Sequence, residues 1–325
     1  MIRTPAWWYR RHAQGAPWWR PALWPLSLIW RGVNAFKRAT ARPYRASLRV
    51  ISVGNLTLGG SGKTPIVAEI LRLLGPRAVG LSRGHGGRLA GPVLVDPARH
   101  SAADVGDEAL LIAQHHDMVI ARDRAAGLKL IEVGDTDIAV LDDAHQNVKI
   151  AKDVHILVVD GDTSNGGWPF GDEGVCPYGP MREPFETGFA RADLVVIWMP
   201  DAASQPDPAL LAKLADKPVF VARLLAQPGA GRVLGFAAIA KPWKFEATLQ
   251  ACGYEVVEFE SFPDHAPFTE AQLTRLSQRA EEQLAELITT EKDWVRLPHE
   301  WRARITCLPI RARFDTPDAL LAQLA

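Results

Sequence analysis

The feature that most constrains the fold is the segment LRVISVGNLTLGGSGKTPIVAEI, residues 48–70. Residues 48–53 form an apolar run that predicts a buried strand, and residues 66–74 carry apolar side chains at helical spacing. The loop between them consists of Thr57, Leu58, Gly59, Gly60, Ser61 and Gly62, followed by Lys63 and Thr64. A strand, a glycine-rich loop, Gly-Lys-Thr and a helix in this order are typical of a phosphate-binding loop.

Such a loop binds phosphate because its backbone N–H groups point inward and the helix N-terminus adds positive potential. Lys63 is expected to reach the β- and γ-phosphates of a nucleotide, and the Thr64 hydroxyl to ligate Mg²⁺. The strict motif requires glycine where Thr57 stands, so this chain departs from it at one position. A glycine-rich turn without a ligand is the alternative, and the flanking strand and helix disfavour it.

Beyond residue 70, short apolar runs alternate with helical stretches. Strands are expected near residues 78–81, 92–95, 118–121, 138–141, 156–159 and 194–198, and helices near 104–115, 124–133 and 208–214. This alternation predicts an α/β fold with a mostly parallel, doubly wound sheet.

A second unit is expected to begin near Pro218, with strands at 218–225, 233–240, 255–259, 287–290 and 306–314 and helices at 245–252 and 269–286. The predicted organisation is therefore a segment 1–40, a nucleotide-binding unit 41–217 and a smaller C-terminal α/β unit 218–325.

The N-terminal segment has an unusual composition. Residues 1–50 hold ten Lys or Arg and no acidic residue, although the whole chain has 37 basic and 37 acidic residues. Six of the 11 tryptophans lie in the first 30 positions. Tryptophan favours the bilayer interface, and cations favour anionic headgroups. The apolar stretch 21–36 is too short and too interrupted to span a bilayer, and it lacks the pattern of a secretory signal. We therefore expect a helix lying on a membrane surface; a helix packed on the protein and a basic nucleic-acid arm are the alternatives.

The overall composition and the cysteines indicate the class of protein and its expected compartment. With 47% hydrophobic and 23% charged residues, the chain has the balance of a globular protein with an ample core. Cys176, Cys252 and Cys307 are too far apart for a disulfide framework or a metal cluster. A reducing cytoplasm is the expected compartment.

Acidic residues at strand ends are the candidates for a metal. Asp142 and Asp143 follow the apolar run 138–141, as magnesium ligands commonly do in nucleotide-binding proteins. Asp160, after the run 156–159, is a weaker competitor for the same role. A pair of acidic residues that merely cap a strand is the alternative.

Phosphoryl transfer to an alcohol also needs a group that accepts the hydroxyl proton. Asp107 is a candidate, although the pattern alone favours a helix N-cap at this position. His265 is a second candidate or an ordinary loop histidine, and Arg182 either neutralises charge on the transferred phosphoryl group or lies on the surface. A phosphate loop alone does not separate a kinase from a switch or a motor.

The segments VGNLTLGGSGKTP, SRGHGG, GDEALLIA, LDDAHQN, GPMREP, FPDH and TEKDWVRL together resemble the tetraacyldisaccharide 4′-kinases of lipid A biosynthesis. The resemblance implies a P-loop NTPase-like fold of two α/β/α sandwich units joined by a two-stranded hinge, which would match residues 218–225 and 306–314. It implies transfer of the ATP γ-phosphate to the 4′-hydroxyl of a tetraacylated glucosamine disaccharide 1-phosphate, with Mg²⁺, giving the bis-phosphorylated lipid A precursor. The expected setting is the cytoplasmic face of the inner membrane, bound peripherally as a monomer and without nucleic acid.

Site roles follow from the resemblance. Lys63 and Thr64 would serve the nucleotide phosphates and Mg²⁺, and Asp107 would be the base, assisted by His265. The metal ligands would be Thr64, Asp142, Asp143 and Glu183, with Gln146 near the nucleotide and Arg182 at the phosphate. Because Asp107 and His265 come from different predicted units, closure of one unit on the other would assemble the site.

Three segments differ from the usual family pattern. The chain reads DDAHQN where the family has DDGFQH or DDGLQH, His85 stands where the family has tyrosine, and the chain reads CPYGPMRE where the family has LPAGPLRE. The other hypothesis is a nucleotide-dependent switch or assembly factor at the membrane without a lipid acceptor. A guanine-specific switch would need Asn-Lys-x-Asp, and Glu291-Lys292-Asp293 has the wrong spacing.

Overall fold

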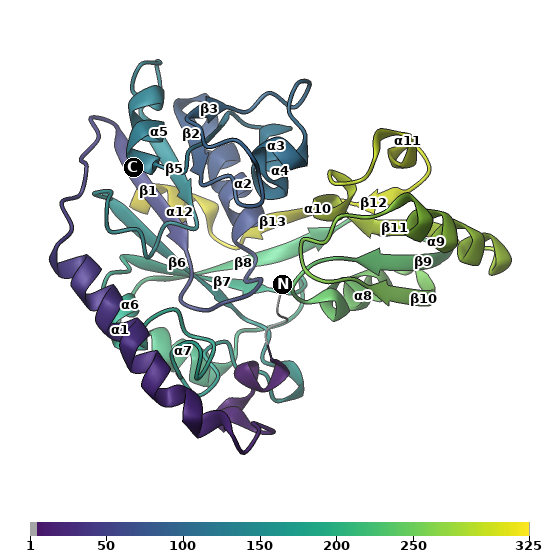
Figure 1. Ribbon diagram of the computed structural model, residues 1–325, viewed down its shortest axis with the longest axis horizontal. Helices are drawn as coiled ribbons and strands as arrows, with labels where there is room; N and C mark the ends of the chain where they lie inside the picture. The colour runs from purple at the N-terminus through teal and green to yellow at the C-terminus, as the bar shows by residue number, and fades with distance from the viewer. Residues whose placement is uncertain (1–4, 325) are drawn as a thin grey trace.

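The computed structural model describes residues 5–324 and contains two β-sheets with helices packed on their faces (Figure 1). The large sheet has nine strands in the order β13-β8-β7-β6-β1-β5-β2-β4-β3, and the small sheet has four in the order β10-β9-β11-β12. Residues 1–4 of the predicted N-terminal segment, Arg3 among them, lie outside the described residues.

The large sheet comprises β1 (Arg49–Gly54), β2 (Ala78–Ser82), β3 (Val93–Leu94), β4 (Met118–Ile120), β5 (Ile138–Asp142), β6 (Val154–Asp160), β7 (Leu194–Met199), β8 (Val219–Ala226) and β13 (Ile310–Phe314). All its neighbouring strands are parallel except β3 against β4 and β13 against β8. The predicted mostly parallel α/β sheet is confirmed.

Helices cover both faces of this sheet, as the near-continuous burial of its strands requires. They are α2 (Lys63–Leu74), α3 (Ala102–Val105), α4 (Asp107–Ala113), α5 (Arg124–Ile131), α6 (Phe185–Phe189), α7 (Pro208–Leu214) and α12 (Pro317–Leu324). Strand β1 lies at the point where the strand order changes direction, with β6 on one side and β5 on the other. Open parallel sheets bind ligands at such a point, at the carboxyl ends of the strands.

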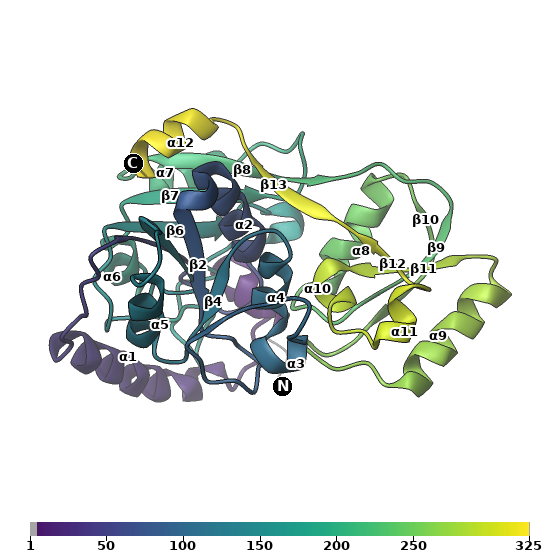
Figure 2. The same cartoon turned by 90° about the horizontal axis from the view of Figure 1, so that it is seen from above.

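The small sheet comprises β9 (Arg232–Ala237), β10 (Glu255–Ser261), β11 (Glu286–Thr290) and β12 (Thr306–Leu308), all parallel to their neighbours. Its helices are α8 (Pro242–Ala251), α9 (Glu270–Glu282), α10 (Glu291–Trp294) and α11 (His299–Arg302). Figure 2 shows this sheet beside the large one, with β8 and β13 running between them.

The single strand predicted at 306–314 is wrong, because the structure divides it into β12 and β13, which belong to different sheets. Pro309 stands between them and has no N–H to donate to a ladder. Strand β13 then pairs antiparallel with β8 along the edge of the large sheet, with Ile310 opposite Ala226.

The helix predicted at 104–115 is also divided. Gly106 has φ of 88° and separates α3 from α4. A Cβ at this position would lie 2.4 Å from the carbonyl oxygen of His85, so only glycine fits. The break makes Asp107 the first residue of α4.

Helix α1 (Trp24–Ala39) follows short 3₁₀ turns and lies along the outside of the large-sheet region (Figure 1). Its Ser27 is buried and Asn34 and Arg38 are half-buried, whereas Trp24, Leu26, Leu28, Ile29, Trp30, Val33 and Phe36 are exposed. The polar face of this helix therefore faces the protein, and its apolar face is directed outward. Within the described residues no helix is long and apolar enough to cross a membrane.

Candidate active site

A cavity of about 1190 Å³ lies between the carboxyl edge of the large sheet and the small sheet. From the large sheet it is lined by residues 58–64 of the glycine-rich loop and by Glu108, Asp142, Asp143, Gln146, Asp160 and Arg182. From the small-sheet region it is lined by Lys241, Lys244, Asp264, His265 and Lys292, among others. Most of the site residues predicted from sequence are therefore brought to one cavity.

The glycine-rich loop follows β1 and ends at Gly62, which has a left-handed conformation and precedes the first turn of α2. A Cβ on Gly62 would lie 2.5 Å from the ring of Trp198, so this position requires glycine for both conformation and space. The Asn55 side-chain amide donates to the Thr57 carbonyl and the Ser61 hydroxyl, each at 2.9 Å, and joins the two ends of the loop. Thr57 itself does not line the cavity.

The Asp143 carboxylate forms ion pairs with two cationic side chains. The Arg182 guanidinium donates to both its carboxylate oxygens at 2.9 Å, and the Lys63 ammonium lies 3.7 Å away. Burial would raise the pKa of Asp143, but Lys63 and Arg182 outweigh it and hold the pKa well below the usual range. Arg182 also donates to the Thr57 carbonyl at 3.1 Å, so it joins the glycine-rich loop to the end of β5.

Asp142 has the opposite electrostatic environment. It is 3% exposed, and its Oδ1 atom has no hydrogen-bond partner. Burial and the nearby carboxylates of Glu108 and Asp143 raise its pKa to about 7. Binding of a cation is favourable beside a buried carboxylate that has an unpartnered oxygen and like-charged neighbours. No group of three or more His, Cys, Asp or Glu in residues 5–324 would hold a metal alone, so a cation here would share its remaining ligands with phosphate and water.

Glu183 does not fit its predicted role as a metal ligand. It is 1% exposed, does not line the cavity, and forms ion pairs with Arg38 at 3.2 Å and Arg191 at 2.6 Å. The Gln146 amide also donates to it at 3.1 Å and to the Asn55 carbonyl at 2.9 Å. Because its oxygens are held by two arginines and an amide, Glu183 organises the segment behind the site.

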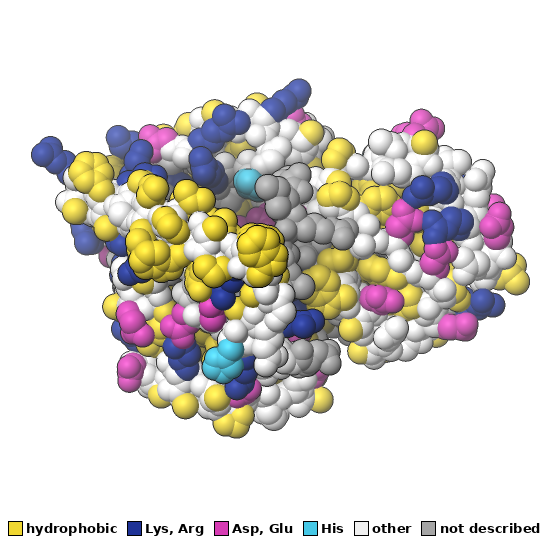
Figure 3. All heavy atoms as spheres, turned by 60° about the horizontal axis from the view of Figure 1, so that its bottom comes forward, with side chains coloured by type: hydrophobic (Ala, Val, Ile, Leu, Met, Phe, Trp, Pro, Cys, Tyr) yellow, Lys and Arg dark blue, Asp and Glu magenta, His cyan; other side chains and the backbone are white. Residues whose placement is uncertain are grey.

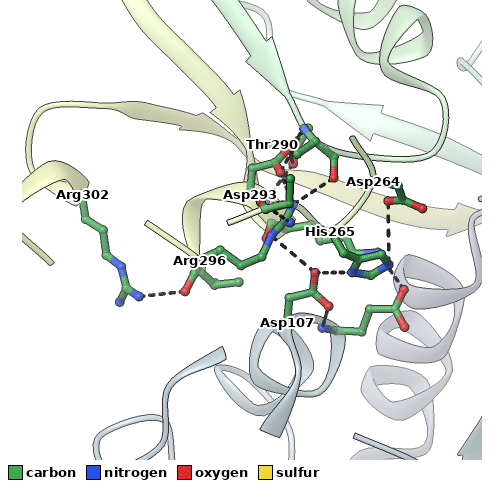
Figure 4. Close-up of polar contacts among 12 residues, drawn as sticks. Asp107, Asp264, His265, Thr290, Asp293, Arg296 and Arg302 are labelled. Atoms are coloured by element: carbon green, nitrogen blue, oxygen red, sulfur yellow. Dashed lines mark hydrogen bonds and ion pairs between the residues drawn. The ribbon is translucent and has the colours of Figure 1, made fainter. Parts of the chain in front are cut away.

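Asp107 and His265, 158 positions apart, form a hydrogen bond of 2.9 Å between Oδ2 and Nδ1 (Figure 4). The other Asp107 oxygen accepts the Glu108 backbone N–H at 2.9 Å, and the Arg296 Nε atom lies 3.5 Å from Oδ2. Burial would raise the pKa of Asp107, but the His265 hydrogen bond and the charges of Lys292 and Arg296 lower it to about 2. Of the pair, His265 lines the cavity, while Asp107 is 4% exposed and lies behind it.

Lys292 is a site residue to which the sequence reasoning gave no role. Its ammonium lies 2.9 Å from the Glu108 carboxylate on α4 and 3.3 Å from His265 Nε2. Burial would lower the pKa of Lys292, but Glu108 and Asp107 outweigh it and raise the pKa. A charged Lys292 beside Nε2 places the imidazole proton on Nδ1, toward Asp107. The segment TEKD carried this lysine, but nothing local in sequence pointed to Glu108.

Asp160, the weaker candidate for the metal, is bound by two lysines. Lys241 Nζ lies 2.6 Å from Oδ2, and Lys244 Nζ lies 2.9 Å from Oδ1. Lys244 also pairs with Asp162 at 3.0 Å. These lysines precede and begin α8, so the contacts join the end of β6 to the small-sheet region and leave no free carboxylate for a cation.

Comparison with known proteins adds a consistent set of matches. The family model described as "Tetraacyldisaccharide-1-P 4'-kinase" matches residues 19–325. A relative named tetraacyldisaccharide 4′-kinase from Caulobacter vibrioides (strain NA1000 / CB15N) is 51% identical over 99% of this chain and 98% of its own length. A relative of the same name from Phenylobacterium zucineum is 50% identical over 98% of this chain and 97% of its own length. The crystal structure of LpxK from Aquifex aeolicus in complex with ATP has a similar fold, with a TM-score of 0.69, 24% identity and coverage of 94% of this chain and 99% of that one.

Proposed function

The chain belongs to the tetraacyldisaccharide-1-P 4′-kinase family, and we propose that it transfers the γ-phosphate of ATP to the 4′-hydroxyl of a tetraacylated glucosamine disaccharide 1-phosphate. The observation that carries the proposal is one cavity that is lined by both the glycine-rich loop and His265, the hydrogen-bonding partner of Asp107. A nucleotide switch without an acceptor has no use for a proton acceptor placed opposite its phosphates.

In this reaction the loop amides and Lys63 bind the β- and γ-phosphates, and Arg182 neutralises charge on the transferred group. We assign the base to Asp107, as the resemblance implies, with His265 holding its carboxylate through Nδ1. His265 Nε2 lies 3.3 Å from the charged Lys292 ammonium, so this nitrogen is not available to take the proton of the acceptor hydroxyl. Asp107 is 4% exposed, so relative motion of the two units would bring the hydroxyl to its carboxylate.

Mg²⁺ fits the donors at the end of β5. Asp142 offers an unpartnered carboxylate oxygen, and Thr64 and Asp143 line the same cavity. Mg²⁺ is usually held by one or two carboxylates together with phosphate oxygens and water, which is the set available here. When bound, the ion offsets the charge that develops on the phosphate oxygens. Asp142 and Thr64 would hold it, and Asp143 would join them if Lys63 and Arg182 turn from its carboxylate to the phosphates.

The outward apolar face of α1 supports binding of a membrane surface. Figure 3 shows apolar side chains gathered along α1, with Lys and Arg side chains around them. Ile29 and Phe36 on this helix are 64% and 70% exposed, and Trp18, which precedes the helix, is 91% exposed. An exposed apolar face bordered by cations fits an anionic lipid surface, where the acyl chains of the acceptor would also lie. We propose that the chain acts as a monomer on the cytoplasmic face of the inner membrane.

The arrangement of the two sheets supports a division into an N-terminal segment, a nucleotide-binding unit and a smaller unit. The expected bounds of 41–217 and 218–325 differ from this arrangement, because β8 and β13 are strands of the large sheet and the smaller unit is inserted between them. Because His265 and Lys292 come from the smaller unit and Asp107 from the larger, relative motion of the units would open and assemble the site.

The test is an assay of purified protein with ATP, Mg²⁺ and the tetraacylated disaccharide 1-phosphate in mixed micelles. We expect acceptor-dependent phosphorylation, which His265→Gln and Asp107→Asn each lower by at least about 10²-fold, while ATP affinity changes little. ATP hydrolysis that the acceptor does not alter would instead support a switch.

Sedimentation with anionic vesicles tests the membrane proposal. The wild-type protein should pellet with the vesicles, whereas the double variant Ile29→Asn/Phe36→Asn should remain in the supernatant. Equal pelleting of wild type and variant would overturn the membrane proposal.

A further inference from the structure

The hydrogen bonds and ion pairs that α1 side chains form with other segments converge on two adjacent residues. Trp30 Nε1 donates to the Arg182 carbonyl at 2.9 Å, Asn34 Nδ2 donates to the same oxygen at 3.4 Å, and Arg38 pairs with Glu183 at 3.2 Å. Within the described residues, every side-chain hydrogen bond or ion pair from α1 to another part of the chain ends on Arg182 or Glu183.

The residue that receives these bonds also organises the reaction centre. The Arg182 side chain donates to both Asp143 oxygens and to the Thr57 carbonyl of the glycine-rich loop. Its backbone N–H donates to the Leu56 carbonyl at 2.7 Å. The peptide of Arg182 is therefore fixed between the loop on one side and α1 on the other.

The adjoining residue gives a second link of the same kind. Glu183 is buried, receives Arg38 from α1, and accepts a hydrogen bond from Gln146, which in turn donates to the Asn55 carbonyl. Movement of α1 would reach both the loop and the end of β5 through these bonds.

From this geometry we infer that α1 sets the position of Arg182, so that seating its apolar face in a lipid surface places this arginine for phosphoryl transfer. Trp30, Asn34 and Arg38 are then positioning residues. The inference rests on the proposed function and adds to it a direct connection between the lipid-facing helix and the reacting phosphate. Two other uses of the helix, anchoring alone and shielding of the protein surface, would not require its polar contacts to converge on Arg182 and Glu183.

Trp30→Phe and Trp24→Phe form a matched pair for testing this. Both tryptophans lie on α1 and are about half exposed, at 47% and 53%, and both changes keep an aromatic ring while removing an indole. Only Trp30→Phe removes a donor to Arg182. On mixed vesicles of phosphatidylethanolamine and phosphatidylglycerol containing the acceptor, we expect kcat of Trp30→Phe to be three- to tenfold below that of Trp24→Phe. Vesicle binding and the KM for ATP should be equal in the two variants.

Arg38→Met and Arg31→Met provide a second pair, in which each variant loses one positive charge from α1. Vesicle binding should weaken equally, whereas kcat should fall further in Arg38→Met, and Arg38→Lys should restore part of it because a lysine still pairs with Glu183. Equal kcat within both pairs, with wild type active, would overturn the inference. A wild-type protein that fails to phosphorylate the acceptor would instead overturn the proposed function.

Discussion

Two strands flank β1, and each ends in a buried aspartate on the cavity: Asp142 on β5 and Asp160 on β6. In sequence the two look alike, since each follows an apolar run. In the structure Asp142 has an unpartnered oxygen and carboxylate neighbours, whereas Asp160 is held by Lys241 and Lys244. The Asp142 carboxylate thus keeps an oxygen that a bound cation can contact, whereas the Asp160 carboxylate is already neutralised by two lysines of the chain itself. The neighbours, and not the strand pattern, decide what a strand-end carboxylate does.

Activity should separate the two positions most strongly. Asp142→Asn removes a ligand of the proposed cation, and we expect acceptor phosphorylation to fall by about 10²- to 10³-fold at saturating Mg²⁺. Asp160→Asn leaves that site intact, so its activity should fall by less than about tenfold. Steady-state rates of both variants at 25 °C provide the measurement. Equal losses would mean that the two strand ends share one function.

The free energy of unfolding should change in opposite directions in the two variants Asp160→Asn and Asp142→Asn. Asp160→Asn removes the carboxylate that two half-buried lysines share, leaving Lys244 with Asp162 alone, and should lower the free energy of unfolding by about 2 kcal/mol. Asp142→Asn removes a buried carboxylate that lies beside Glu108 and Asp143, so without metal the same quantity should rise by about 1 kcal/mol. Urea unfolding in the presence of a chelator gives both values. A destabilised Asp142→Asn would show that this carboxylate has a partner of its own.

The lysine pair allows a finer test of the Asp160 end. Lys241→Met or Lys244→Met alone leaves one cation on Asp160, and each should cost about 1 kcal/mol of unfolding free energy. The double variant leaves a buried carboxylate unpaired and should cost more than the sum. Adding Asp160→Asn to the double variant should then restore part of the loss. Additive costs throughout would indicate that the two lysines act independently of Asp160.

A smaller effect is expected at Lys152, just before β6. It donates to the Asn147 carbonyl at 2.6 Å and forms no ion pair within the described part of the chain. Burial, followed by the charges of Arg191 and Arg124, lowers its pKa to about 7. Because the unfolded chain holds this proton up to about pH 10, the unfolding free energy should rise from pH 7 to 10 relative to Lys152→Met. Lys152 lies outside the cavity, so activity of that variant should stay within about twofold. A pH-independent difference would exclude a neutral buried lysine.

How far the sequence predicts this structure depends on how local each feature is. The glycine-rich loop, the strand before it and the acidic pair after β5 are contiguous patterns, and the structure contains the expected elements there. The break at Gly106 was missed because helical spacing continues across it, although a glycine before Asp107 was a signal. Likewise Pro309 marked the division between β12 and β13.

Contacts between segments that are distant in sequence could not be predicted from local patterns. The pairing of Asp107 with His265 was expected only through the family resemblance, because 158 positions separate them. Nothing near Lys241 and Lys244 in sequence indicates Asp160, and nothing in α1 indicates Arg182. The family resemblance assigned Glu183 to the metal, whereas in the structure its carboxylate is held by Arg38 and Arg191. These partners meet only through the tertiary fold.

The antiparallel pair β8 and β13 has a consequence for how such a chain can change. Ala226 and Ile310 are direct neighbours in this pair, so the chain departs for the small sheet and returns from it at nearly the same point. The small sheet and its helices are thus an insertion between two adjacent antiparallel strands. Residues can be gained or lost within this insertion without any change in the order of the nine strands. The part of the chain that supplies His265 and Lys292 can therefore vary in length while the phosphate-binding sheet keeps its topology.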